Sequence, residues 1–569
     1  MSVAKNMFFS VVMMFIVAGV GAPAIAADVD QQRLQDIIKQ SEIEIAGLSL
    51  AVALGDELVF DGAAGCAQFN DNSDKKCRRP MKSTTKVRVA SISKMITAFA
   101  ALKLVEDDVL DLDEDVSSYL GWSLRNPAYP DSPITVRHLL THTSSLRDPE
   151  TYWIEAPQKF DPYIRSLPEI FAVSGGENNY APGAYFSYSN LGFGLLASVM
   201  ERAAGKRFDE IVRHTVTDPL DLDAGFNWSG VSKKVRRRGA TLYRKVNGVW
   251  EPQIDDEPVL RSRAPFFLSE DDLNIDEYLE AYDPGDNGSL FSPQGGLRAS
   301  VVDLVKLLQL LKDDGHRGAS TPVWKFDSEN LNGDTDGNFF QAYGLGVQTL
   351  VDGQSVFDGH QLIGHPGEAY GLYSGAWVVK SDGAGDDEIS FAFAVTGTPQ
   401  RPRAGAYSGF NNLEEKLVVL AKEIASNALE ARYSGDGLRP FDETRNASFD
   451  IAAAQATARA KGTNVLLILG GNWCHDSRGL AGKMRRPELA ALIADQYELV
   501  YVDLGHRERN LDIAPRFGVT QLHGTPVVLI LSSEGVLLNK ESVHDWRSAA
   551  SISYDETLAY FRSFAPKAK

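Results

Sequence analysis

Apolar residues follow two different spacings between residues 47 and 428. A short apolar run at residues 48–53 is typical of a β-strand. Longer runs with their apolar residues on one helical face predict amphipathic helices at residues 95–106, 191–204 and 302–312. The alternation of strands and helices predicts a large α/β unit.

A polar, turn-rich stretch at residues 433–440 ends this pattern, and a new one begins after it. The new pattern has an alanine-rich helix at residues 451–461 and strand-like runs at 465–469, 499–502 and 527–531. Strand runs of this length with helices between them predict a second, smaller α/β module of roughly 130 residues.

The first residues have the pattern of a secretory signal peptide. Lys5 precedes an apolar run at residues 7–20, and small residues end at Ala26. The run is shorter than the roughly 20 residues that a membrane-spanning helix needs. We expect cleavage after Ala26 and a secreted or periplasmic protein, with an uncleaved anchor as the alternative.

Four segments are therefore expected along the chain. They are a signal peptide at 1–26, a large domain at 31–430, a linker at 431–445 and a second domain at 446–569. The length of 569 residues agrees with two to four domains.

The charge balance limits the partners. There are 76 Asp and Glu residues against 57 Lys and Arg residues, which gives a formal net charge of −19. This surplus repels phosphate backbones and anionic lipids, so we expect no nucleic-acid partner. No other apolar stretch of membrane-spanning length follows the run at residues 7–20, so we do not expect an integral membrane protein.

The chain has three cysteines. Cys66 and Cys77 are separated by a polar segment that resembles a hairpin loop, and an exported protein would hold them in an oxidising compartment. We predict a disulfide between them, with two unpaired thiols as the alternative. Cys474 is then single.

Ser-x-x-Lys occurs three times, so the pattern alone decides nothing: Ser73/Lys76, Ser83/Lys86 and Ser91/Lys94. Ser91 differs because it follows a strand-like segment at residues 87–90 and opens the helix predicted from Met95. At that helix start, Ser91 and Lys94 project on the same side. A serine hydroxyl needs a nearby base to become a nucleophile, and a partly buried Lys94 supplies one.

Two further motifs offer partners for this pair. In Tyr188-Ser189-Asn190, a tyrosine beside a lysine ammonium is favoured as a phenolate and acts as a general base, although Tyr-x-Asn is also a common turn before a helix. His365-Pro366-Gly367 precedes a strand-like run at residues 375–379. An exposed strand edge there would offer a backbone N–H to an oxyanion.

Together these motifs resemble the serine β-lactamase and penicillin-binding-protein superfamily, in its class C β-lactamase-related branch. The resemblance covers about residues 31 to 430 and includes two accessory stretches, at 134–144 and 293–300. It implies an α/β multidomain chain whose first domain has a β-lactamase/DD-peptidase-like fold. That fold is an antiparallel sheet flanked by helices, with a helical subdomain.

The resemblance also implies roles for single residues. Ser91 is the acylated nucleophile, Lys94 and Tyr188 are the proton-transfer pair, and Asn190 holds the lysine and the substrate. His365, Gly367 and Glu368 line the substrate, with the backbone N–H groups of Ser91 and Glu368 as the oxyanion hole. No cofactor and no metal are implied.

Three positions depart from the family pattern. His365 stands where class C β-lactamases usually have lysine, Ser145 stands where glycine is common, and Pro366 lacks a hydroxyl that is common there. An imidazole holds a substrate carboxylate less constantly than an ammonium does. The departures favour a peptidase, amidase or esterase over an efficient lactamase.

Competing signatures are weak. His138 and His142 have the spacing of a helical zinc pair but lack the glutamate of His-Glu-x-x-His, which favours buried structural roles. The Gly-x-Ser-x-Gly motif of α/β-hydrolases is absent from the sequence.

The C-terminal module resembles the thioredoxin-like family. Trp473-Cys474-His475-Asp476-Ser477 stands in place of Trp-Cys-x-x-Cys, and Pro526 matches the family's cis-proline. Cys474 at a helix N-terminus is a candidate redox thiol. The motif has no second cysteine for an internal disulfide, so monothiol chemistry, mixed-disulfide capture and a structural role stay open.

The sequence therefore supports three hypotheses. The first is an exported serine hydrolase that acts on small-molecule or peptide substrates with an amide, ester or β-lactam bond. The second is a catalytically weak protein that binds peptidoglycan fragments or partners. The third is a thiol-redox protein that acts through Cys474. The segment at residues 241–286 is expected to shape the substrate cleft.

Overall fold

The computed structural model describes residues 22–41, 44–70, 76–172, 180–253, 275–311, 318–380, 387–399 and 405–566. Within these residues, nine strands form one antiparallel sheet in the order β3-β2-β1-β14-β13-β12-β11-β10-β9. The strands are β1 (Gly47–Leu54), β2 (Glu57–Phe69), β3 (Cys77–Pro80), β9 (Trp324–Lys325), β10 (Ala342–Tyr343), β11 (Gln348–Leu350), β12 (Gln361–Ala369), β13 (Leu372–Lys380) and β14 (Ile389–Thr396).

Strand β1 shows why this sheet is covered on both faces. All of its residues are buried, and side chains of a strand point alternately to the two faces of its sheet. Its large residues lie in one core and its alanines in the other: Leu48, Leu50, Val52 and Leu54 against Ala51 and Ala53. The small residues let helices approach that second face closely.

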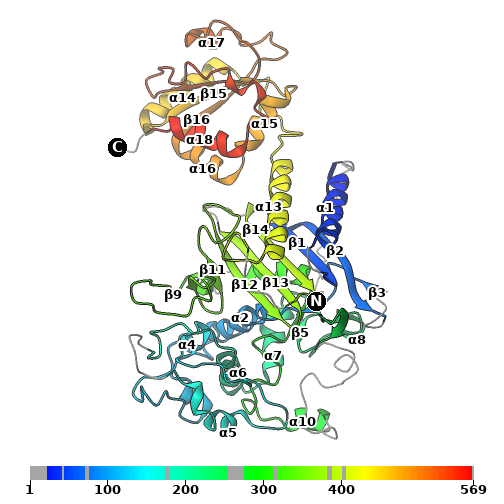
Figure 1. Cartoon of the computed structure of the whole chain (residues 1–569). Coiled ribbons are helices and arrows are strands. Elements are labelled where there is room, and N and C mark those ends of the chain that lie inside the picture. The colour runs from blue at the N-terminus through cyan, green and yellow to red at the C-terminus, as the bar shows by residue number, and fades with distance from the viewer. Residues whose placement is uncertain are drawn as a thin grey trace, which may run out of the picture.

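Helices cover both faces (Figure 1). The helices α1 (Ala22–Lys39) and α13 (Asn412–Arg432) pack on the face with the large β1 residues. The helices α2 (Ile92–Glu106) and α11 (Val301–Leu308) pack on the alanine face. α11 confirms the helix expected from residue 302, although it ends at Leu308 and continues as a 3-10 turn at Gln309–Leu311.

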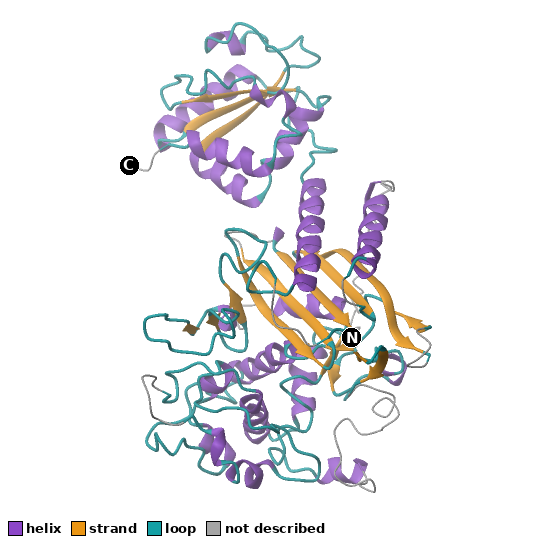
Figure 2. Cartoon of the chain, viewed as in Figure 1, coloured by secondary structure: helices purple, strands orange, loops and turns teal. Residues whose placement is uncertain are grey.

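A mainly helical region lies beyond α2 (Figure 2). Its helices are α3 (Val116–Leu120), α4 (Val136–Leu140), α5 (Phe160–Arg165), α6 (Asn190–Ala204), α7 (Phe208–Val212) and α10 (Ile275–Ala281). The helix α8 (Lys233–Arg236) lies beside β3 instead (Figure 1). α6 packs against α2, α3 and α4 and is buried from Leu191 to Glu201, which accounts for its apolar sequence. The expected antiparallel sheet with flanking helices and a helical subdomain is confirmed.

Short strands connect this helical region to the sheet. β4 (Val87–Arg88), β8 (Leu297–Ala299) and β5 (Gly225–Phe226) form a small sheet beside the start of α2. β6 (Tyr243–Val246) and β7 (Val249–Pro252) form a hairpin. They belong to the segment expected to shape the cleft, whose residues 254–274 lie outside the described part of the chain.

The C-terminal part has a separate sheet in the order β16-β15-β17. β15 (Asn464–Gly470) is parallel to β16 (Tyr497–Asp503) and antiparallel to β17 (Val527–Leu531). The surrounding helices are α14 (Ala447–Lys461), α15 (His475–Lys483), α16 (Pro487–Gln496), α17 (Ile513–Arg516) and α18 (Tyr554–Phe564). β15 is buried on both faces, as its continuous apolar run predicts.

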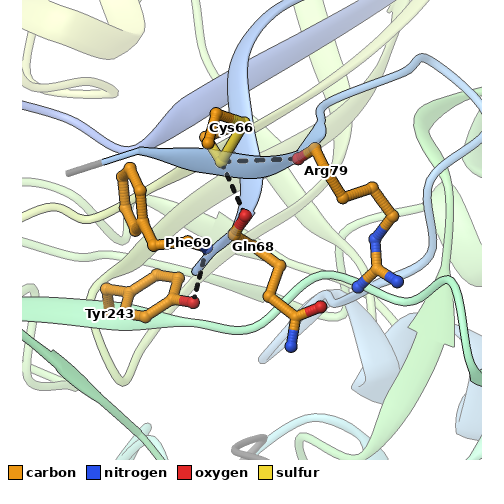
Figure 3. The surroundings of a disulfide bond; sticks show 6 residues. Cys66, Gln68, Phe69, Arg79 and Tyr243 are labelled. Carbon is orange, nitrogen blue, oxygen red and sulfur yellow. Dashed lines mark hydrogen bonds between the residues drawn. A yellow bond between two sulfur atoms is a disulfide. The ribbon is translucent and has the colours of Figure 1, made fainter. Parts of the chain in front are cut away.

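The predicted disulfide between Cys66 and Cys77 is confirmed (Figure 3). It joins β2 to β3, with the two Cα atoms 5.5 Å apart. The backbone N–H of Phe69 donates to the Tyr243 hydroxyl at 3.1 Å, which ties this ribbon to the β6–β7 hairpin.

Two sequence expectations need comment. The strand expected at residues 87–90 stops at Arg88 because Ala90 has a φ of 48°, a left-handed conformation that cannot continue a strand. The signal-peptide prediction falls on residues 1–21, which lie outside the described residues, and on the start of α1. None of the described helices is long and apolar enough to cross a bilayer.

Candidate active site

Ser91 lies at the N-terminal end of α2, directly after the left-handed Ala90. A serine at this position usually accepts a hydrogen bond from the first turn of its own helix. The Ser91 side chain makes no such capping bond. Its hydroxyl instead lies 3.1 Å from Lys94 Nζ, so the turn at Ala90 presents Ser91 to the lysine.

Lys94 is fully buried and contacts three oxygen atoms. Nζ lies 3.1 Å from Ser91 Oγ, 2.7 Å from Asn190 Oδ1 and 3.1 Å from the Gln294 carbonyl oxygen. Burial lowers the pKa of Lys94 to about 7, and the charge of Asp148 acts in the opposite direction. Lys94 therefore exists at neutral pH partly as a free amine, which can accept a proton.

Tyr188-Ser189-Asn190 forms the start of α6. Ser189 caps this helix, and Asn190 is its first residue. Lys94 Nζ lies 4.6 Å from the centroid of the Tyr188 ring, and the same ring packs on His142 with centroids 4.3 Å apart. The structure therefore brings the second motif to the lysine, with Asn190 as the hydrogen-bond partner and Tyr188 as its aromatic wall.

The stretch at residues 293–300 closes the other side of α2. Thr97 donates to the Pro293 carbonyl oxygen at 2.8 Å, and the Leu297 N–H donates to Ser93 Oγ at 3.0 Å. These bonds hold the Gln294 carbonyl in place for Lys94. Residues 293–300 thus contact Lys94 and α2 through backbone carbonyl and N–H groups.

His365 lies in β12 and is completely buried. Its Nε2 lies 2.9 Å from the Tyr343 hydroxyl and its Nδ1 lies 2.6 Å from the Pro366 carbonyl oxygen. The centre of the His365 ring also lies 6.2 Å from the centre of the Tyr188 ring, so the buried histidine borders the site.

Gly367 brings β12 against the segment that precedes Ser91. A Cβ atom at this position would lie 2.4 Å from the Val89 carbonyl oxygen and 2.4 Å from Ser374 Oγ, so the close approach requires glycine. β11 pairs with β12 only from Leu362 to Gly364. β12 also contacts α2, and Glu368, the residue after Gly367, is exposed.

The other Ser-x-x-Lys matches are separated from this site. Ser83 donates to Asp61, and Lys86 forms a buried ion pair with Asp303. Ser73 lies outside the described residues.

Ser145 accounts for one departure from the family pattern. Its φ is 68°, in the left-handed region where glycine is favoured. Asn126 Nδ2 donates to its hydroxyl, and this buried bond holds the residue in a conformation that costs about 1 kcal/mol or more. Ser145 thus adopts the left-handed backbone conformation that glycine would adopt at this position.

The histidines that have zinc-pair spacing have structural roles. His138 Nδ1 accepts the Thr135 N–H at 3.3 Å and caps α4. His142 Nδ1 accepts the Ser189 N–H at 3.0 Å. Burial lowers the pKa of both, and for His142 the charge of Lys94 lowers it further. Both are therefore neutral hydrogen-bond acceptors at neutral pH.

Sequence reasoning missed Asp148, which fixes the start of α6. Its Oδ1 accepts bonds from Ser189 Oγ and the Leu191 N–H, and its Oδ2 accepts bonds from the Asn190 N–H and Nδ2, all at 2.8 to 2.9 Å. The carboxylate holds Asn190 with its Oδ1 toward Lys94. No local signal marks Asp148, because it caps a helix more than 40 residues away.

We expect Asp148→Asn to shift the pH dependence of activity. Removing the negative charge takes away an influence that raises the pKa of Lys94, so the acid limb of the kcat/KM profile should move to lower pH. Loss of the capping bonds should cost about 1 kcal/mol in urea unfolding. Asp334→Asn is the control, because Asp334 bonds Tyr185 and not α6. Lower stability with an unmoved limb would contradict the electrostatic role.

Cys474 begins α15 in the C-terminal part, and it is 8% exposed. The Thr525 hydroxyl donates to its sulfur at 3.2 Å, and the peptide bond between Thr525 and Pro526 is cis, as predicted. Trp473 beside it is 44% exposed. The thiol therefore lies under the Thr525 turn, with the indole at the surface.

Two segments of the chain match models of known protein families. Residues 31–409 match the family model described as Beta-lactamase. The chain belongs to the β-lactamase family. Residues 445–533 match a model described as Thioredoxin-like, so the chain also carries a thioredoxin-like domain.

Relatives of this β-lactamase family chain are named as hydrolases. It is 28% identical over 185 residues to the D-alanyl-D-alanine-carboxypeptidase/endopeptidase AmpH of Escherichia coli, covering 31% of this chain and 44% of that protein. It is 31% identical over 210 residues to Esterase EstB of Burkholderia gladioli, covering 34% and 51%. The matches thus span about half the length of these curated relatives. They support a hydrolase function.

A D-amino acid amidase from Ochrobactrum anthropi has a TM-score of 0.48 and 20% identity, covering 70% of this chain and 98% of that one.

Proposed function

We propose that the protein is an exported serine hydrolase that forms an acyl-enzyme at Ser91 on amide, ester or β-lactam substrates. The surroundings of Lys94 carry this proposal. A neutral amine has two N–H bonds and one lone pair. Asn190 Oδ1 and the Gln294 carbonyl oxygen can accept both N–H bonds. The lone pair is then left for the Ser91 hydroxyl.

The reaction proceeds in two stages. Lys94 Nζ accepts the hydroxyl proton while Ser91 Oγ forms a bond to the substrate carbonyl carbon, and the carbonyl oxygen becomes an oxyanion. The leaving group then takes a proton from the pair of Lys94 and Tyr188 as its bond to carbon breaks. Water repeats the sequence on the resulting ester and releases the acid.

The oxyanion is assigned to the backbone N–H groups of Ser91 and Glu368. Support comes from Gly367, whose close contact with the Val89 carbonyl brings this part of β12 beside the nucleophile. In other acyl-transfer enzymes, loss of one such donor costs roughly 10²- to 10³-fold in rate. Asn190, His365 and Gly367 complete the proposed substrate-binding residues.

Among amides, esters and β-lactams, the observations favour some substrates over others. Relatives named as a peptidase and as an esterase favour peptide-like amides and esters. His365 in place of lysine, turned toward Tyr343, argues against efficient β-lactam turnover. Export is supported by the disulfide, because such bonds persist in oxidising compartments.

The division of the chain at residues 431–445 also remains our proposal. The two family matches leave residues 410–444 between them. Within that interval α13 ends at Arg432 and α14 begins at Ala447. The division is therefore supported by the break between two helices.

Adduct mapping tests the nucleophile and the substrate class together. The mature protein is incubated with a penicillin or with p-nitrophenyl acetate, and intact mass and peptide maps are recorded. We expect fast ester turnover and an acyl group that maps to Ser91 when the reaction is quenched with acid. The parallel Ser91→Ala sample should stay unmodified.

Other outcomes separate the alternatives. A lasting penicillin adduct on Ser91 would indicate a penicillin-binding acyl-enzyme with slow deacylation. Neither adduct nor turnover from folded protein would favour the binding protein for peptidoglycan fragments. An adduct at another residue would refute the assignment of Ser91.

A further inference from the structure

Exposed cations gather on α8 and on the turn that follows it. Five of the six residues at positions 233–238 are Lys or Arg, in a chain whose formal net charge is −19. Four of these side chains are exposed and form no ion pair within the part of the chain that the structure describes: Lys233, Lys234, Arg237 and Arg238. We call these four residues the α8 cluster.

The edge strand β3 lies beside this cluster (Figure 1). Arg79 of β3 donates to the carbonyl oxygens of Arg237 and Gly239, both at 2.7 Å, and its Nε has no partner among the described residues. Burial lowers the pKa of Arg79, and the charges of Arg78 and Arg238 lower it further. The surface around α8 therefore contains cations that lie close enough to repel one another.

This arrangement opposes the formation of α8. Ser232 caps the helix, and the first turn contains Lys233 and Lys234 but no acidic residue. The positive end of the helix dipole disfavours cations at this position. Both lysines also have an arginine four positions later, a spacing at which like charges on a helix repel. The folding of this segment therefore does not account for its charges.

Other cations before and after this segment are paired. Arg207 contacts Asp209, and Lys245 contacts Glu44. Asp223 lies near the start of α8, but its carboxylate accepts bonds from the N–H and the hydroxyl of Ser232. The described carboxylates thus leave the α8 cluster unpaired, and the cluster produces a local positive potential on an acidic protein.

We propose that the α8 cluster docks the protein reversibly on a membrane whose surface carries anionic phospholipids. A bilayer presents many phosphate groups in one plane, and its lipids move laterally, so anionic headgroups can gather beneath four cations. Each Lys or Arg near such a surface strengthens binding about fivefold. The attraction acts within a Debye length of about 10 Å, so negative charge elsewhere on the chain opposes it only weakly.

A membrane fits this cluster better than a nucleic acid does. This choice rests on the proposed export, because an exported protein meets lipid surfaces outside the cytoplasm. A nucleic acid also carries its phosphates at a fixed spacing along a chain that extends beyond four cations, and the acidic remainder of the protein would repel it. RNA binding is therefore an outcome that the test has to exclude.

Sedimentation with lipid vesicles tests the proposal. The mature protein is used, so that the apolar run at residues 7–20 is absent. We expect it to sediment with vesicles of equal parts phosphatidylcholine and phosphatidylglycerol, and to stay in solution with phosphatidylcholine alone. Raising the salt from about 0.1 M to about 1 M shortens the Debye length to about 3 Å and should release it. No binding to the anionic vesicles, or equal binding to both kinds, would overturn the proposal.

A matched pair of variants locates the binding surface. The first combines Lys233→Gln, Lys234→Gln, Arg237→Gln and Arg238→Gln, and it should bind anionic vesicles at least about 100-fold more weakly. The control replaces by Gln four other exposed cations that form no ion pair among the described residues, so the net charge changes equally: Arg439, Arg459, Arg485 and Lys540. We expect the control to bind as the wild type does. An equal loss in both variants would show that net charge controls binding, and the proposal would be wrong.

Two more measurements separate docking from folding, from catalysis and from RNA binding. In urea, the variant without the α8 cluster should be at least as stable as the wild type, because the removed charges repel one another. Vesicle binding needs no turnover, so it can be found even if Ser91 forms no acyl-enzyme, and ester hydrolysis can be found without vesicle binding. Fluorescence titration with a single-stranded RNA is the last arm. Tighter binding to RNA than to anionic vesicles at equal phosphate concentration would refute the assignment to a membrane.

Discussion

Ser91→Ala is expected to lower kcat/KM for an activated ester at least about 10⁴-fold and to abolish the acyl adduct. The methyl group that remains cannot form the acyl bond. Lys94 would still be buried beside Asn190 and Gln294, but its lone pair would face no hydroxyl. Initial rates with p-nitrophenyl acetate, together with intact mass, measure both effects.

Ser83→Ala is the matched control for this prediction. Ser83 belongs to the second Ser-x-x-Lys pattern, yet it bonds Asp61, and the lysine of that pattern pairs with Asp303. We expect Ser83→Ala to retain full turnover. If Ser91→Ala kept a tenth of wild-type activity and Ser83→Ala lost it, the nucleophile would have been chosen wrongly.

Most of the fold can be predicted from the sequence, because the spacing of apolar residues indicates which faces of a strand or helix are buried. β1 and β15 are continuous apolar runs that are buried on both faces, and α6 is apolar because helices surround it. Strand direction does not follow in the same way. β17 is antiparallel to β15, and an apolar run of five residues looks alike in either direction.

Backbone conformation explains another difference between sequence and structure. Val87, Arg88 and Val89 are typical strand residues, and Ala90 does not interrupt that pattern in sequence. Its left-handed conformation ends β4 at Arg88 and turns the chain into α2. A strained residue directly before the proposed nucleophile arises from tertiary contacts, which propensities do not contain.

Some residues of the candidate site could be identified from the sequence, and others only from the structure. Ser91, Lys94 and Asn190 could be chosen from motifs, and the structure brings them together. Asp148 could not, because it matters through residues distant in sequence. Asp148 caps a helix that begins at Asn190. Such relations exist only after folding.

Activity is expected to depend on pH through Lys94. Its pKa is lowered to about 7 by burial, and only the free amine can accept the Ser91 proton. The value of kcat/KM should therefore rise tenfold per pH unit below about 7 and level off above it, because protonation removes the base. A pH series with a neutral ester, whose own charge does not change, measures this limb.

Lys94→Arg should lower kcat/KM at least about 10³-fold at every pH and remove the acid limb. Arginine keeps a positive charge but stays protonated over the whole accessible range, so it cannot act as the base. Lys94→Met, which has neither charge nor base, should lose a similar amount. The comparison separates proton acceptance from electrostatic stabilisation, because an enzyme that used only the charge would tolerate arginine.

Lys86→Arg is the control for this last experiment. Lys86 is also buried, but it pairs with Asp303 and not with Ser91. Its replacement should leave the midpoint of the acid limb unchanged even if stability falls. If Lys94→Arg retained activity within tenfold of the wild type, Lys94 would act through its charge, and the proton acceptor would have to be sought in Tyr188.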